Sequence, residues 1–169
     1  MKKIYYFVAL TMSFLYGIHM MGSGISYLVQ YIATSSGSNL SDFILYIIIS
    51  FLLFAASGTS LMMHIRNKEK GVSSLWPCII LLISASTILF GVQTINGIRM
   101  SKYISSNNQV IKTYQEMVNP PEEIIKQLRG NNAAVIVSFV FSLSEAFLFM
   151  GFSILAFITH RKEGKCNEE

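Results

Sequence analysis

Four apolar stretches alternate with shorter polar segments along this chain. They cover roughly residues 4–32, 43–65, 75–98 and 133–159. A helix needs about 20 mostly apolar residues to cross a bilayer, and each stretch is at least that long. The pattern therefore predicts an all-α protein whose four spans form a transmembrane bundle with antiparallel neighbours. It also makes the lipid bilayer the first partner of the chain.

The connection between the third and fourth stretches, about residues 100–132, is predicted to be an outer loop that carries two short amphipathic helices. Apolar residues recur there at helical spacing between Val110 and Val118. Residues 119–123 read Asn-Pro-Pro-Glu-Glu, which is typical of a helix start, and Gly130 is expected to end that second helix. The two helices either rest on the tops of the spans or offer a surface to a partner.

Composition agrees with a chain that lies mostly in lipid. Of its 169 residues, 52% are hydrophobic and 13% are charged, whereas a soluble domain has about 25% charged residues. One four-helix unit uses up this length, so a single domain over residues 1–169 is expected. The net charge of +4 comes from basic residues at the span ends, without a basic face that would indicate nucleic-acid binding.

The basic residues also predict the orientation, because cytoplasmic flanks collect Lys and Arg. With four spans, the two ends and the second connection share one side of the membrane. That side has Lys2, Lys3, Arg66, Lys68, Lys70, Arg161, Lys162 and Lys165. The opposite side has Arg99, Lys102, Lys112, Lys126 and Arg129. We expect an integral membrane protein with both termini in the cytoplasm, in the plasma membrane, with an internal membrane as the alternative.

Two residues near the span ends are candidates for modification. Asn39 begins an Asn-Leu-Ser sequon on the predicted outer side, although its closeness to the second span argues against a glycan there. Cys166 lies close to the membrane and is a candidate for palmitoylation, with a plain free thiol as the alternative.

Small residues recur at four-residue spacing in every span. Helices in lipid associate through close packing, so these positions are predicted to face other helices and to support a homo-oligomer. They are Gly17, Gly24, Ser57, Gly58, Ser60, Gly91, Ser138, Ser142 and Ala146.

Glu145 is the one strong acid in the middle of a predicted span. A carboxylate at that depth costs about 2.5–3.5 kcal/mol on insertion scales, so it is expected to be turned inward and paired. His19 lies at a similar depth in the first span, and we predict a hydrogen bond between the two side chains. The pair is interpreted as a polar clamp that orients helices, with a proton or cation pathway as the alternative.

Nothing in the sequence indicates catalysis. No His, Asp and Glu residues are spaced as metal ligands, and no serine or cysteine has a nearby base. We therefore expect no enzymatic activity and no cofactor.

Three segments resemble the membrane-spanning four-domain subfamily A, the family of the B-lymphocyte CD-twenty antigen and the IgE-receptor beta chain. Residues 14–24 are similar to the glycine-bearing first helix of that family. Residues 56–61, Ala-Ser-Gly-Thr-Ser-Leu, are similar to its Ser-Gly-x-Ser-Leu motif, and residues 143–147 to its glutamate followed by aromatic residues. The family's second outer loop commonly holds a cysteine pair, and residues 100–132 contain no cysteine. The cytoplasmic ends are also shorter here than in the family.

The resemblance implies a non-enzymatic accessory or adaptor subunit that modulates receptor signalling or the assembly of other membrane proteins. It also keeps the alternative of a cation channel or transport component that uses Glu145.

Overall fold

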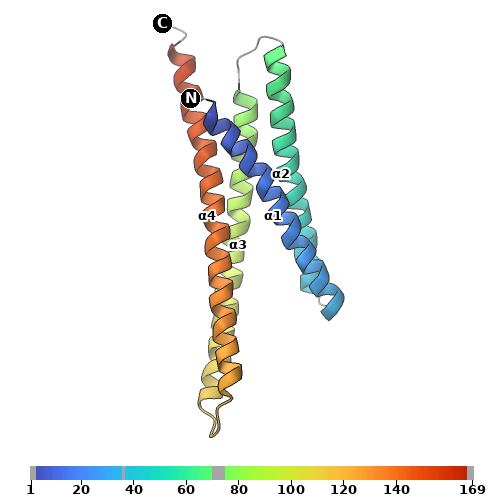
Figure 1. Ribbon diagram of the computed structural model, residues 1–169, viewed down its shortest axis with the longest axis vertical. Helices are drawn as coiled ribbons and strands as arrows, with labels where there is room; N and C mark the ends of the chain where they lie inside the picture. The colour runs from blue at the N-terminus through green and yellow to red at the C-terminus, as the bar shows by residue number, and fades with distance from the viewer. Residues whose placement is uncertain (1–2, 36, 70–74, 167–169) are drawn as a thin grey trace. The chain divides into compact units, whose positions relative to one another are not determined.

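The computed structural model describes residues 3–35, 37–69 and 75–166, and these residues form four long α-helices with no strand among them. The helices are α1 (Ile4–Thr34), α2 (Gly37–Glu69), α3 (Trp76–Gln115) and α4 (Glu122–Cys166) (Figure 1). Each is long and apolar enough to cross a membrane. The prediction of an all-helical chain with four membrane-capable helices is therefore confirmed, whereas the antiparallel bundle of all four stays a prediction.

Every helix extends beyond the apolar stretch that predicted it. The polar segment between the first two apolar stretches is mostly helical, because α1 continues to Thr34 and α2 already starts at Gly37. Ser35 ends α1 in the left-handed conformation, at φ 52°, and its backbone N–H donates to the carbonyl oxygen of Tyr31. At the other end of α2, Arg66 and Lys68 lie in the last turn, where they complement the negative end of the helix dipole.

The predicted loop over residues 100–132 is wrong in its detail. The structure has no two separate short helices there, because α3 runs on without a break to Gln115 and α4 starts at Glu122. Gly130 does not end a helix but lies inside α4. A glycine in a helix interior costs only about 1 kcal/mol, which packing against a neighbouring helix can offset.

The start of α4 follows the predicted chemistry. Pro120 and Pro121 precede the helix, and Glu122 and Glu123 occupy its first turn near the positive end of the dipole. The N–H of Ile125 donates to the carbonyl oxygen of Pro121 at 3.1 Å.

The chain groups into two compact units, of which the first comprises residues 1–89 and 148–169 and the second residues 90–147. The prediction of a single domain stays a prediction. In the first unit α1 and α2 lie side by side in opposite directions (Figure 1). Contacts of α1 move toward the start of α2 as α1 advances, from Tyr6 with Ser60 to Gly17 with Ser50.

The second unit is a helical hairpin made of the later part of α3 and the earlier part of α4. Phe90 contacts Phe147 at one end, and Asn107 bonds Asn132 near the other. These pairs show that the two segments also run in opposite directions.

Candidate functional site

The interface between α1 and α2 is fastened by two buried serine hydroxyls. Ser13 Oγ donates to the carbonyl oxygen of Leu53 at 3.0 Å, and Ser50 Oγ donates to that of Gly17 at 2.8 Å. The Ser13 side chain is 0% exposed and that of Ser50 is 2% exposed. Each bond crosses from one helix to the backbone of the other, so the two helices are held at one register.

Gly17 allows this close approach. A Cβ atom at this position would lie 2.7 Å from Phe54 Cε1, a distance that real Cβ atoms essentially never show. Farther along α1, Gly24 is also buried. A Cβ atom added at Gly24 would lie 3.2 Å from Ile47 Cδ1 of α2. Both glycines were predicted to face another helix, and the structure places both against α2.

A polar cluster joins α1, α2 and α3 in the first unit. The Tyr6 hydroxyl donates to the carbonyl oxygen of Ser60 at 3.0 Å and lies equally close to Ser60 Oγ. Ser60 Oγ in turn donates to the carbonyl oxygen of Cys78 at 3.4 Å. All three side chains are at most 1% exposed, and Cys78 is a free thiol. Because each polar group has a partner, the cluster ties three helices together without leaving a buried polar group unsatisfied.

Two histidines lie at helix ends of the same unit. The His64 ring lies 5.5 Å from the rings of Tyr6 and Phe7, measured between centroids. The N–H of Leu75, just before α3, donates to His160 Nε2 of α4 at 3.2 Å, and the His160 ring meets Trp76 edge-on. His160 therefore accepts from a backbone N–H at the start of α3, where helices leave such groups without an intrahelical partner.

Asparagines fasten the second unit. Asn107 Nδ2 donates to Asn132 Oδ1 at 2.8 Å, and Asn132 Nδ2 donates to Asn108 Oδ1 at 3.2 Å. Asn132 is 8% exposed. Closer to the apolar part of the hairpin, Gly97 lies under Phe139, whose Cζ would be 2.8 Å from a Cβ at this position.

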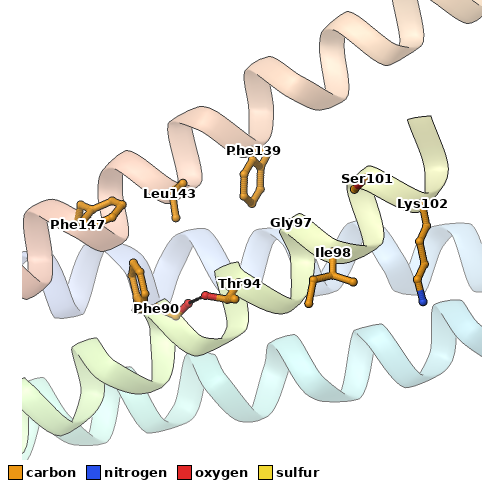
Figure 2. Close-up of a pocket in the computed structure, with 9 residues that line it drawn as sticks. All are labelled: Phe90, Thr94, Gly97, Ile98, Ser101, Lys102, Phe139, Leu143 and Phe147. Atoms are coloured by element: carbon orange, nitrogen blue, oxygen red, sulfur yellow. Dashed lines mark hydrogen bonds between the residues drawn. The ribbon is translucent and has the colours of Figure 1, made fainter. Parts of the chain in front are cut away.

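An open groove of about 560 Å³ runs along one side of this hairpin, and we call it the α3–α4 groove (Figure 2). Its α3 side is formed by Phe90, Thr94, Gly97, Ile98, Ser101 and Lys102. Its α4 side is formed by Phe139, Leu143 and Phe147. The Phe90 and Phe147 rings meet edge-to-face at 5.1 Å at one end, and Figure 2 shows the Lys102 side chain at the other. The groove is therefore apolar along most of its length and cationic at one end.

The two intramembrane candidates belong to different units. Glu145 is half-buried on α4 in the second unit, and His19 is exposed on α1 in the first. The hydrogen bond predicted between them stays a prediction. No group of three or more His, Cys, Asp and Glu side chains is placed to hold a metal ion within the ranges that the structure describes.

The remaining predicted packing residues fall into two groups. Ser57 and Ala146 are buried, and Ser57 Oγ donates to the carbonyl oxygen of Phe54 within its own helix at 3.0 Å. Gly58, Gly91 and Ser138 are exposed, and Ser142 is half-buried. A Cβ on either of these two glycines would meet no atom within 4 Å. Sequence spacing alone does not separate the two groups, because small residues occur on both inward and outward faces.

The two modification candidates are placed differently. Asn39 lies in the first turn of α2, and its Nδ2 donates to Thr34 Oγ1 at 3.2 Å. The backbone of Cys166 ends α4, and its side chain lies outside the described residues. A glycan on the first and an acyl group on the second both stay predictions.

Sequence reasoning missed the Tyr6 cluster, His160, the asparagine cluster and the groove. A signal existed for the asparagines, since Asn107 precedes the end of α3 at Gln115 and Asn132 follows the start of α4 at Glu122 by similar numbers of residues. No signal in the sequence pairs Tyr6 with Ser60 and Cys78, because the three come from separate helices.

Comparisons with protein families, with curated sequences and with solved structures find no significant match to this chain. What can be stated of its class therefore comes from the fold: four helices that are long and apolar enough make it compatible with a multi-pass membrane protein.

Proposed function

We propose that this protein is a non-enzymatic, oligomeric accessory subunit that lies in a membrane and packs against further copies of itself and against other membrane proteins. The observation that carries the proposal is a set of glycines that face open space. A Cβ on Gly58, Gly91 or Gly151 would meet no atom within 4 Å, and all three glycines are exposed.

Each of these glycines lies next to a large exposed apolar side chain one turn farther along the same face. Gly58 is followed by Met62, which is 73% exposed, Gly91 by Ile95 at 49%, and Gly151 by Leu155 at 42%. We call the open space at each glycine a notch. Helices in lipid associate closely at such notches beside apolar side chains, because lipid tails already satisfy apolar groups and only tight packing favours contact. The resemblance to the membrane-spanning four-domain subfamily A supports the same role.

The first experiment fills two notches at once. In the double variant Gly58→Leu, Gly91→Leu, we expect crosslinking of purified protein in lipid nanodiscs to shift from an oligomer to a monomer, with helix content unchanged. The matched control, Met62→Leu with Ile95→Leu, exchanges the neighbouring side chains for others of similar size and should keep the oligomer. A wild-type protein that is monomeric, or a double variant that keeps its oligomer, would contradict the proposal.

The alternative function is a cation channel or transport component that uses Glu145. A measurement of cation flux distinguishes it from the accessory role. The accessory role predicts that purified protein in liposomes leaves cation flux at the level of empty liposomes, in the wild type and in Glu145→Gln alike. Flux that depends on Glu145 while the variant still assembles would replace the accessory role with conduction.

A further inference from the structure

We propose that the α3–α4 groove binds one acyl chain of an anionic phospholipid, with the acidic headgroup held at Lys102. The proposal goes beyond the accessory function and does not depend on it. It depends on the shape of the groove, on the position of its one cationic end and on the chemistry of its walls.

The length of the groove matches one leaflet. From Phe90 to Lys102 the helix rises about 18 Å, at about 1.5 Å per residue. Half of a hydrocarbon core of about 30 Å is about 15 Å, which is the depth that the chains of one leaflet reach. An acyl chain laid along the groove would therefore extend from the membrane border to a point near the bilayer centre.

The charge lies at the end where a headgroup would be, on the side of the membrane that the basic residues predict to be the outer one. Lys102 follows the predicted end of the third span, residue 98, by four positions, which is about 6 Å of helix. Its side chain is exposed, and lysines at this depth extend their amines toward the interface. A headgroup with net negative charge is opposite in charge to Lys102, whereas phosphatidylcholine is zwitterionic and neutral overall. Phe90 and Phe147, at the far end, are the surface expected against the end of a hydrocarbon chain.

The polar group in the middle of the groove is already satisfied. Thr94 Oγ1 donates to the carbonyl oxygen of Phe90 at 3.0 Å, which is the dashed line in Figure 2. Its hydroxyl proton is thus used within its own helix, and the Thr94 methyl group adds to the apolar wall. Between Phe90 and Ile98, the groove therefore offers dispersion contacts. A hydrocarbon chain bound there would not bury an unsatisfied hydrogen-bond donor.

The groove is also held in shape by its own helices. Gly97 lies against the Phe139 ring, with 2.8 Å between Phe139 Cζ and a notional Cβ on Gly97. Close backbone approach at this position fixes the depth of the groove floor. A site that exists before the ligand arrives loses less conformational entropy on binding.

Native mass spectrometry of the full chain, released from mild detergent with added phosphatidylglycerol or phosphatidylcholine, tests the proposal. We expect phosphatidylglycerol to be retained preferentially, and Lys102→Gln to reduce that preference by roughly fivefold, as expected for one basic residue near a membrane surface. The matched control is Lys112→Gln, an exposed lysine on the same helix outside the groove. It should leave the preference unchanged.

A second variant tests the apolar part of the site. Thr94→Trp fills the groove from an exposed position and should reduce retention of both lipids, whereas Thr87→Trp, exposed on the same helix but outside the groove, should not. Equal retention of the two lipids by the wild type would overturn the proposal, as would equal effects of the two lysine variants. A Thr94→Trp protein that changes oligomeric state but retains lipid normally would show that a second copy of the chain fills the groove instead.

Discussion

The Ser50 hydroxyl of α2 donates a 2.8 Å hydrogen bond to the carbonyl oxygen of Gly17 on α1. The same glycine leaves room for the Phe54 ring, one turn farther along α2. Gly17 thus takes part both in the hydrogen bond from Ser50 and in the close packing of Phe54. The backbone of α1 approaches α2 closely enough to be bonded only because position 17 has no side chain.

Replacing Ser50 by alanine removes this bond, so we expect Ser50→Ala to lower the free energy of unfolding by about 0.6 kcal/mol, with an upper bound of about 1.7 kcal/mol, the range for interhelical hydrogen bonds in lipid. Thermal unfolding in detergent measures it. The control is Ser26→Ala, because exposed Ser26 bonds to Gly22 within its own helix, and it should change stability very little.

Adding one methyl group at two glycines of α1 should have opposite effects. Gly17→Ala forces the Phe54 ring to move and should destabilise by about 1–3 kcal/mol, as overpacking does. Gly22→Ala meets no atom within 4 Å and should be neutral or stabilising by up to about 1 kcal/mol, because alanine is the better helix former. Equal stabilities of the two variants would mean that α1 and α2 do not approach each other at Gly17.

The thiol of Cys78 reports on the Tyr6 cluster. Since Cys78 is 0% exposed, a maleimide should label it slowly in a Cys166→Ser background. Tyr6→Phe removes the hydroxyl that bonds Ser60 and should accelerate labelling by roughly tenfold, the factor for about 1.4 kcal/mol of lost stability. Tyr5→Phe, the adjacent half-buried tyrosine, should leave the rate unchanged.

The hairpin of the second unit should open when its asparagine cluster is removed. Asn132→Leu breaks the bonds to Asn107 and Asn108, and we expect amide hydrogen exchange over residues 107–132 to accelerate by roughly tenfold. Asn131→Leu changes the exposed neighbour and serves as the control. No acceleration in the first variant would show that the cluster does not hold the two helices together.

A double-mutant cycle tests the predicted bond between Glu145 and His19. If the pair exists, the stabilities of Glu145→Ala, His19→Ala and the double variant in detergent should differ from additivity by at least about 0.5 kcal/mol. Strictly additive effects would show that Glu145 and His19 do not interact and form no polar clamp.

The apolar pattern was sufficient to predict four helices because any 20-residue apolar run in lipid has to satisfy its own backbone hydrogen bonds. It failed between residues 100 and 132 because the end of an apolar run is not the end of a helix: polar residues such as Ser106 and Asn107 continue α3 when a neighbouring helix packs beside them. The start at Glu122 was predicted correctly, since prolines and acids act locally.

The candidate sites were less predictable for a related reason. The bond from Ser50 to Gly17 and the contact of Phe139 with Gly97 depend on which faces meet, and that depends on rotation about each helix axis. Four-residue spacing is present equally at Gly17, which is packed, and at Gly58, which is open. The spacing of small residues identifies one face of a helix but does not show which neighbouring helix, if any, packs against that face.

The continuation of α3 from residue 98 to Gln115 corresponds to about 26 Å of helix beyond the predicted third span. Headgroup layers add only about 5–8 Å on each side of the hydrocarbon, so most of that segment would extend beyond the lipid surface if α3 crosses a bilayer at the predicted span. Hydrogen bonds of Asn132 with Asn107 and Asn108 hold the segment beside α4, so the hairpin would present the turn near Val118 to the aqueous phase.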